Sequence, residues 1–496
     1  MIRVLGFCQL LVFSSIVCST KPPNFVLILS DDQDIYLGGM YATTPICCPS
    51  RASILTGLYL HNHKTFNNSI SGGCNSDLWQ STFEYETFAK YLKRAGYNTM
   101  YAGKYLNTYG SHNAKGVQHV PPGWDWWMGL VGNSKYYNYT LSVNGTAVYH
   151  GDSYTDDYLT DVIKRNGLDF LRFRGNENDP FFMVLSTPAA HAPFTPAPQY
   201  QGVFNNTSAP RLPNFNRQSL NKHWMLRMPP PILSSQTLHL MDDIYRRRLE
   251  TLLSVDDLVA EIIEQLETLD VLENTYIIYT SDHGYHIGQF GLPWDKRQPY
   301  EFDLKIPLLM RGPGIPKNEV VNVPVLTIDL APTILTLANI PVPAKIDGKS
   351  FVLNNKSVIS SNIELKKHRT RTFLTEYRGE GNMHSNSPSC LSATDNTLAE
   401  CSSEAECKCQ DAINNTYNCL RHISKQCDFQ YCEFIDSENF KEFYDLAYDP
   451  YQIHNIAQSI NETLYTHFHK LLKYLSKCKG QSCSDIQTTR SMSFGR

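Results

Sequence analysis

Short apolar runs along the chain predict buried strands. The run over residues 24–30 lacks any alternation of polar and apolar positions, which is typical of a parallel strand covered on both faces. Similar runs cover residues 181–186, 275–280 and 306–310. The first run ends in Asp31-Asp32, and open α/β sheets carry their sites at the carboxyl ends of strands. The pattern therefore predicts a functional site beside these two aspartates.

Apolar positions between the runs recur with helical spacing. A long helix is indicated by apolar residues three or four positions apart, namely Leu252, Val255, Val259, Ile262 and Leu266. Residues 82–95 and 326–338 are shorter helical candidates. Strands that alternate with helices predict an α/β domain, which we assign to residues 20–350.

Changes in composition divide the rest of the chain. Residues 205–235 are rich in Pro, Asn and Ser, and are expected to form a long surface excursion. From residue 351 the chain is rich in cysteine and carries few helical patterns before Asn461. Residues 351–496 are therefore expected to form a smaller α+β subdomain.

The N-terminus has the features of a secretory signal peptide. Residues 1–19 contain Arg3, then a mostly apolar stretch, then small residues suited to cleavage. No later stretch is long and apolar enough to span a bilayer, so we expect a soluble mature protein with no membrane span. Eight glycosylation triplets agree with passage through the secretory pathway, at Asn67, Asn138, Asn144, Asn205, Asn206, Asn355, Asn414 and Asn461.

Cysteine usage indicates an oxidising compartment. Of 14 cysteines, Cys8 and Cys18 lie in the signal peptide, and nine of the other twelve lie between Cys390 and Cys483. Disulfides are therefore expected mainly in the C-terminal third. The formal net charge of −4 argues against nucleic acid as a partner, because nucleic-acid-binding proteins usually show a basic surplus.

Residues 47–57 contain the most informative motif. They read Cys-Cys-Pro-Ser-Arg-Ala-Ser-Ile-Leu-Thr-Gly, which fits the sulfatase signature Cys-x-Pro-Ser-Arg-x-x-x-Leu-Thr-Gly, and the chain resembles the sulfatase family over residues 24–484. Other matching stretches are residues 133–140, 221–224, 253–257 and 430–434. The resemblance implies an alkaline-phosphatase-like α/β fold, with a large mixed sheet flanked by helices and a smaller cysteine-rich C-terminal subdomain. The alternative is that Cys47 is half of a disulfide.

Cys47 is the implied source of the nucleophile. In the sulfatase family this cysteine is oxidised to formylglycine, so the resemblance implies modification of Cys47 and the formylglycine-generating enzyme as a partner during maturation. The physical chemistry agrees, because Pro49 suits the first turn of a helix, and a helix N-terminus attracts an anion. A hydrated aldehyde supplies an oxygen nucleophile, and Arg51 is expected to brace it or the sulfate.

The resemblance also implies a Ca²⁺ site. Asp31, Asp32 and Asp282 match the carboxylate ligands of the family, and residue 47 and His283 complete the set. Hard cations prefer several oxygen ligands, and clustered carboxylates supply them. Without the signature, the Asp31-Asp32 pair alone would indicate a helix cap or turn. His283 either binds the metal or forms a hydrogen bond beside it.

Further residues match sulfate-binding positions. They are Lys104, His191 and Lys296, although Leu106 stands where many family members carry a histidine. In the implied mechanism, Asp282 accepts a proton from the attacking hydroxyl, and His191 or Lys296 donates one to the departing sugar oxygen. Two other histidines either line the sugar pocket or pack in the core, namely His223 and His286.

The implied reaction is hydrolysis of 6-O-sulfate esters on N-acetylglucosamine or glucosamine units of heparan sulfate and keratan sulfate. The implied location is the lysosome, with secretion as the alternative, and a homodimer is a further expectation. Two other functions stay open: an extracellular heparan sulfate 6-O-endosulfatase, and a non-catalytic secreted glycoprotein with a damaged fold. The chain lacks the long basic insertion of the endosulfatases, which weighs against the first of these.

One interval departs from the family pattern. Only residues 33–46 separate Asp32 from Cys47, where the family normally has a helix and a strand. A parallel crossover alone takes about a dozen residues, and Gly38-Gly39 interrupts this interval. We expect the loss of a central or near-central strand and of a helix, which would leave unpaired backbone groups and an uncovered apolar sheet face. The chain is then a shortened natural form bridged by a loop, a splice product or an incomplete gene model.

Overall fold

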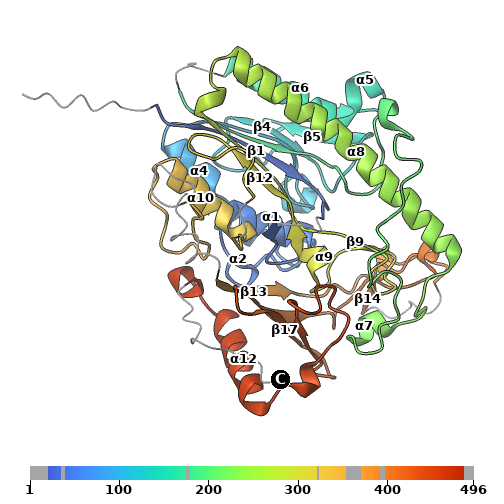
Figure 1. Cartoon of the computed structure of the whole chain (residues 1–496). Helices are drawn as coiled ribbons and strands as arrows, with labels where there is room; N and C mark the ends of the chain where they lie inside the picture. The colour runs from blue at the N-terminus through green and yellow to red at the C-terminus, as the bar shows by residue number, and fades with distance from the viewer. Residues whose placement is uncertain are drawn as a thin grey trace, which may run out of the picture.

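An eight-stranded mixed sheet forms the centre of the large part of the molecule (Figure 1). The computed structural model describes residues 21–34, 39–174, 179–320, 323–352, 370–390 and 397–484, so the expected signal peptide (residues 1–19) lies outside the described residues. The strand order is β12-β8-β1-β7-β3-β4-β5-β6. The strands are β1 Asn24–Ser30, β3 Asn98–Lys104, β4 Trp126–Leu130, β5 Tyr139–Val143, β6 Thr146–His150, β7 Phe181–Ser186, β8 Thr275–Ser281 and β12 Leu308–Arg311.

The centre of this sheet is parallel and its edges are antiparallel. Strands β8, β1, β7, β3 and β4 run in one direction, whereas β12, β5 and β6 pair antiparallel. Three predicted buried strands are confirmed as β1, β7 and β8. The run over residues 306–310 is instead divided into β11 (Lys305–Ile306) and the edge strand β12, on which Leu309 is exposed. Pro307 lies between the two, and proline has no N–H for a sheet ladder.

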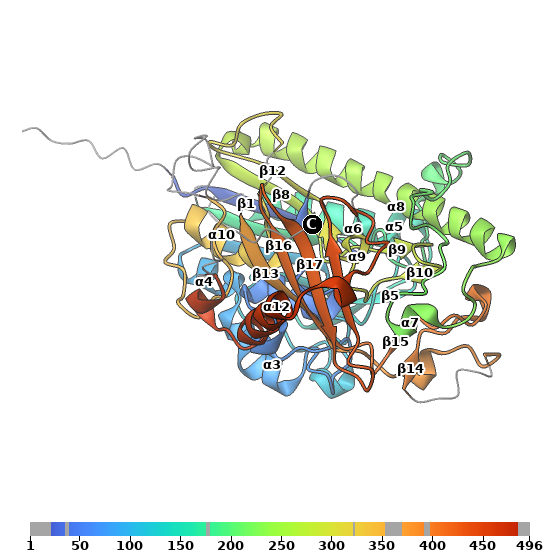
Figure 2. The same ribbon diagram turned by 60° about the horizontal axis from the view of Figure 1, so that its bottom comes forward.

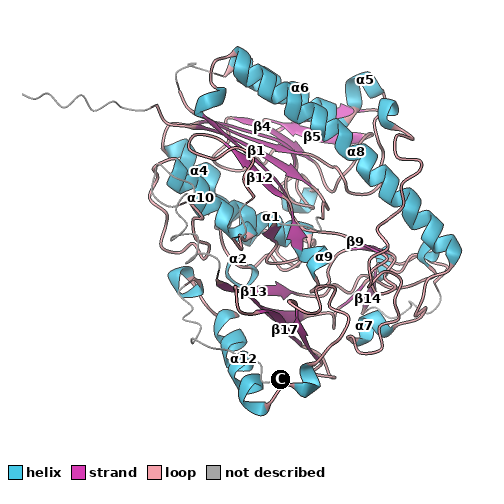
Figure 3. Cartoon of the chain, in the orientation of Figure 1, coloured by secondary structure: helices cyan, strands magenta, loops and turns pink. Residues whose placement is uncertain are grey.

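Helices cover both faces of the large sheet (Figure 3). One face packs against α6 (Leu159–Phe173) and α8 (Ser235–Thr268), and the other against α1 (Cys47–Thr56), α4 (Phe88–Arg94) and α10 (Leu330–Leu337). Successive residues of β1 point into opposite cores, so this strand is apolar throughout. The expected α/β fold class is confirmed. The shorter helices are α2 Leu60–His63, α3 Asp77–Ser81, α5 Tyr154–Asp157, α7 Trp224–Arg227 and α9 Glu301–Leu304.

A smaller sheet follows in the C-terminal part of the chain. Its antiparallel order is β13-β16-β17-β18, and α12 (Glu462–Leu475) lies across it (Figure 2). Aromatic side chains of the strands pack against Phe468 and Leu472 of the helix. These strands are β13 Arg371–Tyr377, β16 Tyr417–Ile423, β17 Asp428–Phe434 and β18 Lys441–Asp445. Within the described ranges, none of the helices combines the length and apolar character that crossing a bilayer requires.

The disulfides concentrate in this C-terminal part, as expected. Of the five disulfides in the described part of the chain, four lie there, and the fifth joins the start of α1 to the loop before α3. They are Cys390–Cys407, Cys401–Cys409, Cys419–Cys432, Cys478–Cys483 and Cys48–Cys74. Two short strand pairs accompany them, β9 (His286–Ile287) with β10 (Trp294–Asp295) and β14 (Leu398–Ala399) with β15 (Asp411–Ala412).

The short interval between Asp32 and Cys47 leaves no gap in the large sheet beside β1. That strand pairs with β7 on one side and with β8 on the other. Within the described residues of the interval, β2 (Met40–Tyr41) pairs with β11, outside the large sheet. The expected loss of a central strand, with unpaired neighbours, is therefore wrong.

The expected uncovered apolar surface has a counterpart in the structure. A cavity of about 650 Å³ lies between α8 and the edge of the sheet, with Gln33 and Gly39 among its lining residues. Side chains of α8, β8 and β12 form about half of its wall, including Val259, Ile277 and Leu308. The interval thus borders an apolar groove at the edge of the sheet.

Part of the predicted surface excursion is buried. Of residues 205–235, Lys222, His223, Met225 and Leu226 are at most 1% exposed. The apolar residues of α7 join a core with Tyr300 and other side chains of later segments. The expectation of a surface location is wrong for this part, because Pro, Asn and Ser content does not reveal the apolar turn at residues 224–226.

Candidate active site

The ends of four strands bring the candidate residues together. Asp31 and Asp32 follow β1, Lys104 ends β3, His191 follows β7, and Asp282 follows β8. The carboxyl ends of parallel strands meet at one edge of a sheet, and loops there carry side chains toward a common point. All five residues are buried.

Cys47 lies at the first turn of α1, below these strand ends. Cys47 is fully buried, and its sulfur is a thiol. The disulfide at this helix is formed by Cys48 instead, so the alternative that Cys47 is half of a disulfide is wrong. His283 Nε2 lies 3.3 Å from the Cys47 sulfur. Burial alone would raise the pKa of the thiol, but the positive charges of Lys104, Lys296 and His283 outweigh it and hold the pKa well below its ordinary value. The position of this sulfur therefore suits a negatively charged group.

Two lysines pair with the two aspartates of the β1 turn. Lys104 Nζ donates to Asp31 at 2.6 Å, and Lys296 Nζ donates to both oxygens of Asp32 at 3.0 and 2.8 Å. Burial raises the pKa of each carboxyl, but the combined positive charges of the lysines, His191 and the other cations nearby lower both pKa values. Both carboxylates are therefore ionised, and both ammonium groups face the same buried cluster.

Arg51 connects the nucleophile helix to the strand ends. Its Nε donates to Asp282 at 2.8 Å, and its Nη1 donates to the Lys104 carbonyl and to the Ser186 hydroxyl, each at 2.8 Å. Its Nη2 lies 3.4 Å from Asp31. The structure thus shows Arg51 bracing the carboxylates and strand ends around the sulfur.

The buried side chains fit a hard divalent cation. One ligand atom from each of Asp31, Cys47, Asp282 and His283 lies within 4.8 Å of the others, and Asp32, Cys47 and His191 form a second such group. Asp31 Oδ1 is buried without a hydrogen-bond partner among the described residues. Clustered carboxylate oxygens are the donors that a cation such as Ca²⁺ prefers, whereas imidazole nitrogen is a less usual ligand for it.

His191 is oriented toward the same cluster. Its Nδ1 hydrogen-bonds to the Ala192 carbonyl at 2.7 Å, which leaves Nε2 facing Asp32 at 3.8 Å. Burial lowers its pKa, but the negative charges of Asp32 and Asp31 together raise the pKa above the ordinary value. The ring is therefore suited to hold a proton near the aspartate.

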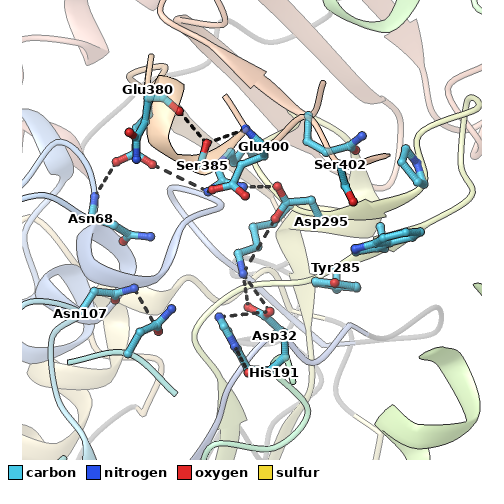
Figure 4. A pocket seen from close by; sticks show the side chains of 18 of the residues that line it. Asp32, Asn68, Asn107, His191, Tyr285, Asp295, Glu380, Ser385, Glu400 and Ser402 are labelled. Atoms are coloured by element: carbon cyan, nitrogen blue, oxygen red, sulfur yellow. Dashed lines mark hydrogen bonds and ion pairs between the residues drawn. The ribbon is translucent and has the colours of Figure 1, made fainter. Parts of the chain in front are cut away.

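A pocket of about 470 Å³ opens above Asp32 and His191 (Figure 4). Lys296 also lines it. Much of its opposite wall comes from the disulfide-rich segment of the C-terminal part, which includes Glu380 and Glu400. Sequence reasoning missed this wall, because none of its residues belongs to a recognisable motif. The other polar residues that line the pocket as a whole include Asn68, Asn107, Asn133, Tyr285, Asp295, Arg297, Asn382, Ser385, Ser402 and Gln410.

The two undecided histidines pack in the core. His223 is stacked on Phe434 with ring centroids 3.9 Å apart, and its Nε2 lies 2.9 Å from Asp436. His286 is fully buried, with Nδ1 3.0 Å from Asp303 and Nε2 bonded to a glutamine. Neither residue lines the pocket above Asp32, so the packing interpretation holds for both.

The glycosylation triplets lie mostly at the surface. Asn67 is half-buried near the pocket, and Asn355 lies outside the described residues. The exposed ones are Asn138, Asn144, Asn205, Asn206, Asn414 and Asn461.

Comparison with known proteins identifies the family. The profile described as Sulfatase matches residues 29–340. The chain belongs to the sulfatase family. This sulfatase is 46% identical over 505 residues to the human protein named N-acetylglucosamine-6-sulfatase, covering 97% of this chain and 89% of that one. It is 41% identical over 384 residues to the Drosophila melanogaster protein named Extracellular sulfatase SULF-1 homolog, covering 72% of this chain and 33% of that one.

A solved structure supports the fold of the sulfatase. It is described as a complex with its substrate D-glucosamine-2-N,6-O-disulfate, and its TM-score is 0.70 at 22% identity, covering 92% of this chain and 98% of that one. The protein is a sulfuric ester hydrolase by family membership. Sulfatases generally use a metal ion and formylglycine, and the buried Asp/Cys/His cluster is where this chain would carry them.

Proposed function

We propose that this sulfatase removes the 6-O-sulfate group from terminal N-acetylglucosamine or glucosamine units of heparan sulfate and keratan sulfate. The observation that supports this proposal most is the fully buried Cys47 among the positive charges of Lys104, Lys296 and His283. Lys296 also lines the 470 Å³ pocket, which links this cluster to the space for a substrate. The name of the human relative supports the sugar, and that of the solved complex supports a 6-sulfated glucosamine. A wall from the C-terminal part limits the pocket on the side opposite Asp32, which favours a chain end.

The residues have distinct proposed roles. Lys104 and Lys296 bind sulfate oxygens, Asp282 takes a proton from the nucleophile, and His191 or Lys296 gives one to the departing sugar oxygen. Formylglycine made from Cys47 would supply an oxygen nucleophile that a thiol lacks. A Ca²⁺ ion held by Asp31, Asp32, residue 47, Asp282 and His283 would neutralise sulfate charge.

The cellular setting is also proposed. The formylglycine-generating enzyme is the maturation partner, the lysosome is the destination with secretion as the alternative, and a homodimer is the expected assembly. We keep the division into a signal peptide (1–19), a catalytic domain (20–350) and a C-terminal subdomain (351–496) as part of this proposal. The non-catalytic alternative has no support in the described cluster, where every candidate catalytic residue is present and buried.

The test compares substrates and one nucleophile variant. The purified secreted protein is assayed at pH 5 on oligosaccharides that end in 6-sulfated N-acetylglucosamine and on intact heparin. We expect sulfate release from chain ends, formylglycine at position 47 by peptide mass spectrometry, and no release by Cys47→Ala at near-normal secretion. Cys427→Ala is the control, because Cys427 is the second cysteine outside the disulfides among the described residues.

Two results would contradict the proposal. Active enzyme with an unmodified Cys47 would exclude the mechanism. Release from internal disaccharides of heparin, without end trimming, would favour an endosulfatase.

A further inference from the structure

A buried arginine of α8 holds the turn that carries Asp31 and Asp32. Arg248 is 3% exposed, and its Nη2 donates to the Asp32 carbonyl at 2.6 Å and to Asp34 Oδ1 at 3.0 Å. The guanidinium lies over the Tyr285 ring, with Cζ 4.1 Å from the ring centroid. Helix α8 runs along one face of the sheet (Figure 1), so this contact joins the helix layer to the carboxyl end of β1.

The backbone at this turn needs such support. Asp32 has a φ of 61°, in the left-handed region that residues other than glycine rarely adopt. Strained conformations of this kind persist only where surrounding contacts fix them. The Asp32 N–H donates to Asp282 at 3.2 Å, and the next N–H, of Gln33, donates to the Ser281 hydroxyl at 2.9 Å.

Two different elements hold the backbone N–H and carbonyl groups around Asp32. The N–H groups of Asp32 and Gln33 are held by residues after or at the end of β8, whereas the carbonyl of Asp32 is held by Arg248 alone among the described residues. In this conformation the Asp32 carboxylate meets Lys296 at 2.8 Å and lies 3.4 Å from His283. A different peptide orientation would move the carboxylate away from this cluster.

We propose that Arg248 is a positioning residue for the cation-binding cluster, fixing the Asp32 peptide so that the Asp32 carboxylate faces Lys296 and His283. The inference rests on the Ca²⁺ site of the proposed function. Arg248 itself does not line the pocket, and its hydrogen bonds reach the Asp32 carbonyl and Asp34, so it acts on the site through the Asp32 turn. The turn at Asp32 is thus held by residues of α8 and β8, which do not belong to the short interval 33–46 that follows it.

Arginine and lysine differ at such a site. The planar guanidinium donates to a carbonyl and a carboxylate while it is stacked on an aromatic ring, whereas a lysine ammonium is a point charge that does not stack in this way. Groups that orient metal ligands typically change metal affinity about 10- to 100-fold when they are altered. Arg248→Lys keeps the positive charge but removes the planar guanidinium, so this variant tests whether the paired hydrogen bonds and the stacking position Asp32.

The experiment measures Ca²⁺ binding directly. Wild type, Arg248→Lys, Asp34→Asn and Arg247→Met are stripped of metal and titrated with Ca²⁺ by calorimetry, and kcat and KM are measured for the proposed substrate. Arg247 is the matched control, because it neighbours Arg248 but is 53% exposed and pairs with Asp243. We expect about a tenfold or larger loss of Ca²⁺ affinity in Arg248→Lys, with kcat falling more than KM rises. We expect wild-type affinity in Arg247→Met and a loss of about threefold or less in Asp34→Asn, which keeps the Asp32 contact.

The outcomes separate this inference from the proposed function. Wild-type protein that binds no Ca²⁺ would refute the proposed metal site. If Arg248→Lys binds Ca²⁺ as tightly as the wild-type protein does, the positioning role of Arg248 is overturned. If Arg248→Lys is not secreted, Tyr285→Leu removes the ring that orients the guanidinium, and unchanged Ca²⁺ affinity in that variant would overturn the role equally.

Discussion

At the scale of single residues, Arg51 shows how one side chain organises the site. It donates to Asp282, the Lys104 carbonyl and Ser186, and each of these groups is buried. A lysine has no planar fork to reproduce these bonds. We therefore expect Arg51→Lys to lose about 3–5 kcal/mol of unfolding free energy, as for a broken buried ion pair. We also expect kcat to fall about 100-fold through misplacement of the reacting groups.

Denaturant unfolding and steady-state kinetics check this expectation. Arg172→Lys is the control, because Arg172 is half exposed on α6. A kcat within twofold of wild type, together with unchanged stability, would show that Arg51 does not organise the site.

The sequence predicted the residues that bear chemistry better than those that shape the pocket. Cys47, Lys104 and Asp282 stand in motifs or at strand ends, where residue type and position together indicate a role. Glu400 and Arg248 have no such mark. Their positions depend on how the disulfide-rich segment and α8 pack against the sheet, which a linear pattern does not specify.

At the scale of elements, the three buried strands were predicted correctly, whereas the division of the run at residues 306–310 was missed. Continuous apolar runs reflect cover on both faces, which holds for β1, β7 and β8. The run at residues 306–310 differs from them in containing Pro307, and it supplies an edge strand after that proline. The order of strands in the sheet decides which run lies at an edge, and that order is a property of the tertiary fold.

The interval 33–46 gives the prediction at this scale. Its residues border an apolar groove between α8, β8 and β12, where Leu309 is 64% exposed. A helical insert of about 20 residues between Asp34 and Gly39 would cover the groove, and burying about 100–200 Å² of apolar surface contributes about 2–5 kcal/mol. We expect the insert to raise secreted yield and melting temperature, and to raise specific activity or leave it unchanged.

A Gly/Ser insert of equal length is the control for this comparison. It lengthens the loop without an apolar face, so it should not stabilise the protein. Equal yield, activity and melting temperature for the natural and helical forms would show that the short interval is a tolerated variation.

At the scale of the whole molecule, His61 joins the catalytic part to the C-terminal part. It lies on α2, its Nδ1 is 2.7 Å from Glu376 on β13, and its Nε2 is 2.9 Å from the Cys478 carbonyl after α12. Both ring nitrogens face acceptors, and only the protonated ring donates from both. Burial alone would lower the pKa of His61, but the bond to Glu376 and its charge outweigh burial and raise the pKa above 6.5.

The raised pKa makes the connection depend on pH. A group with a higher pKa in the folded state contributes its full stability below the unfolded pKa of about 6.5, and loses it as pH rises through the folded pKa. We therefore expect His61→Asn to lower the free energy of unfolding by about 1.5–3 kcal/mol at pH 5, and by less at pH 8. The measurement is chemical unfolding at both pH values, with the exposed His112→Asn as control. An equal loss at pH 5 and pH 8 would show that the imidazole acts only by packing, whereas the expected difference would mean that acidity strengthens the contact between the two parts of the enzyme.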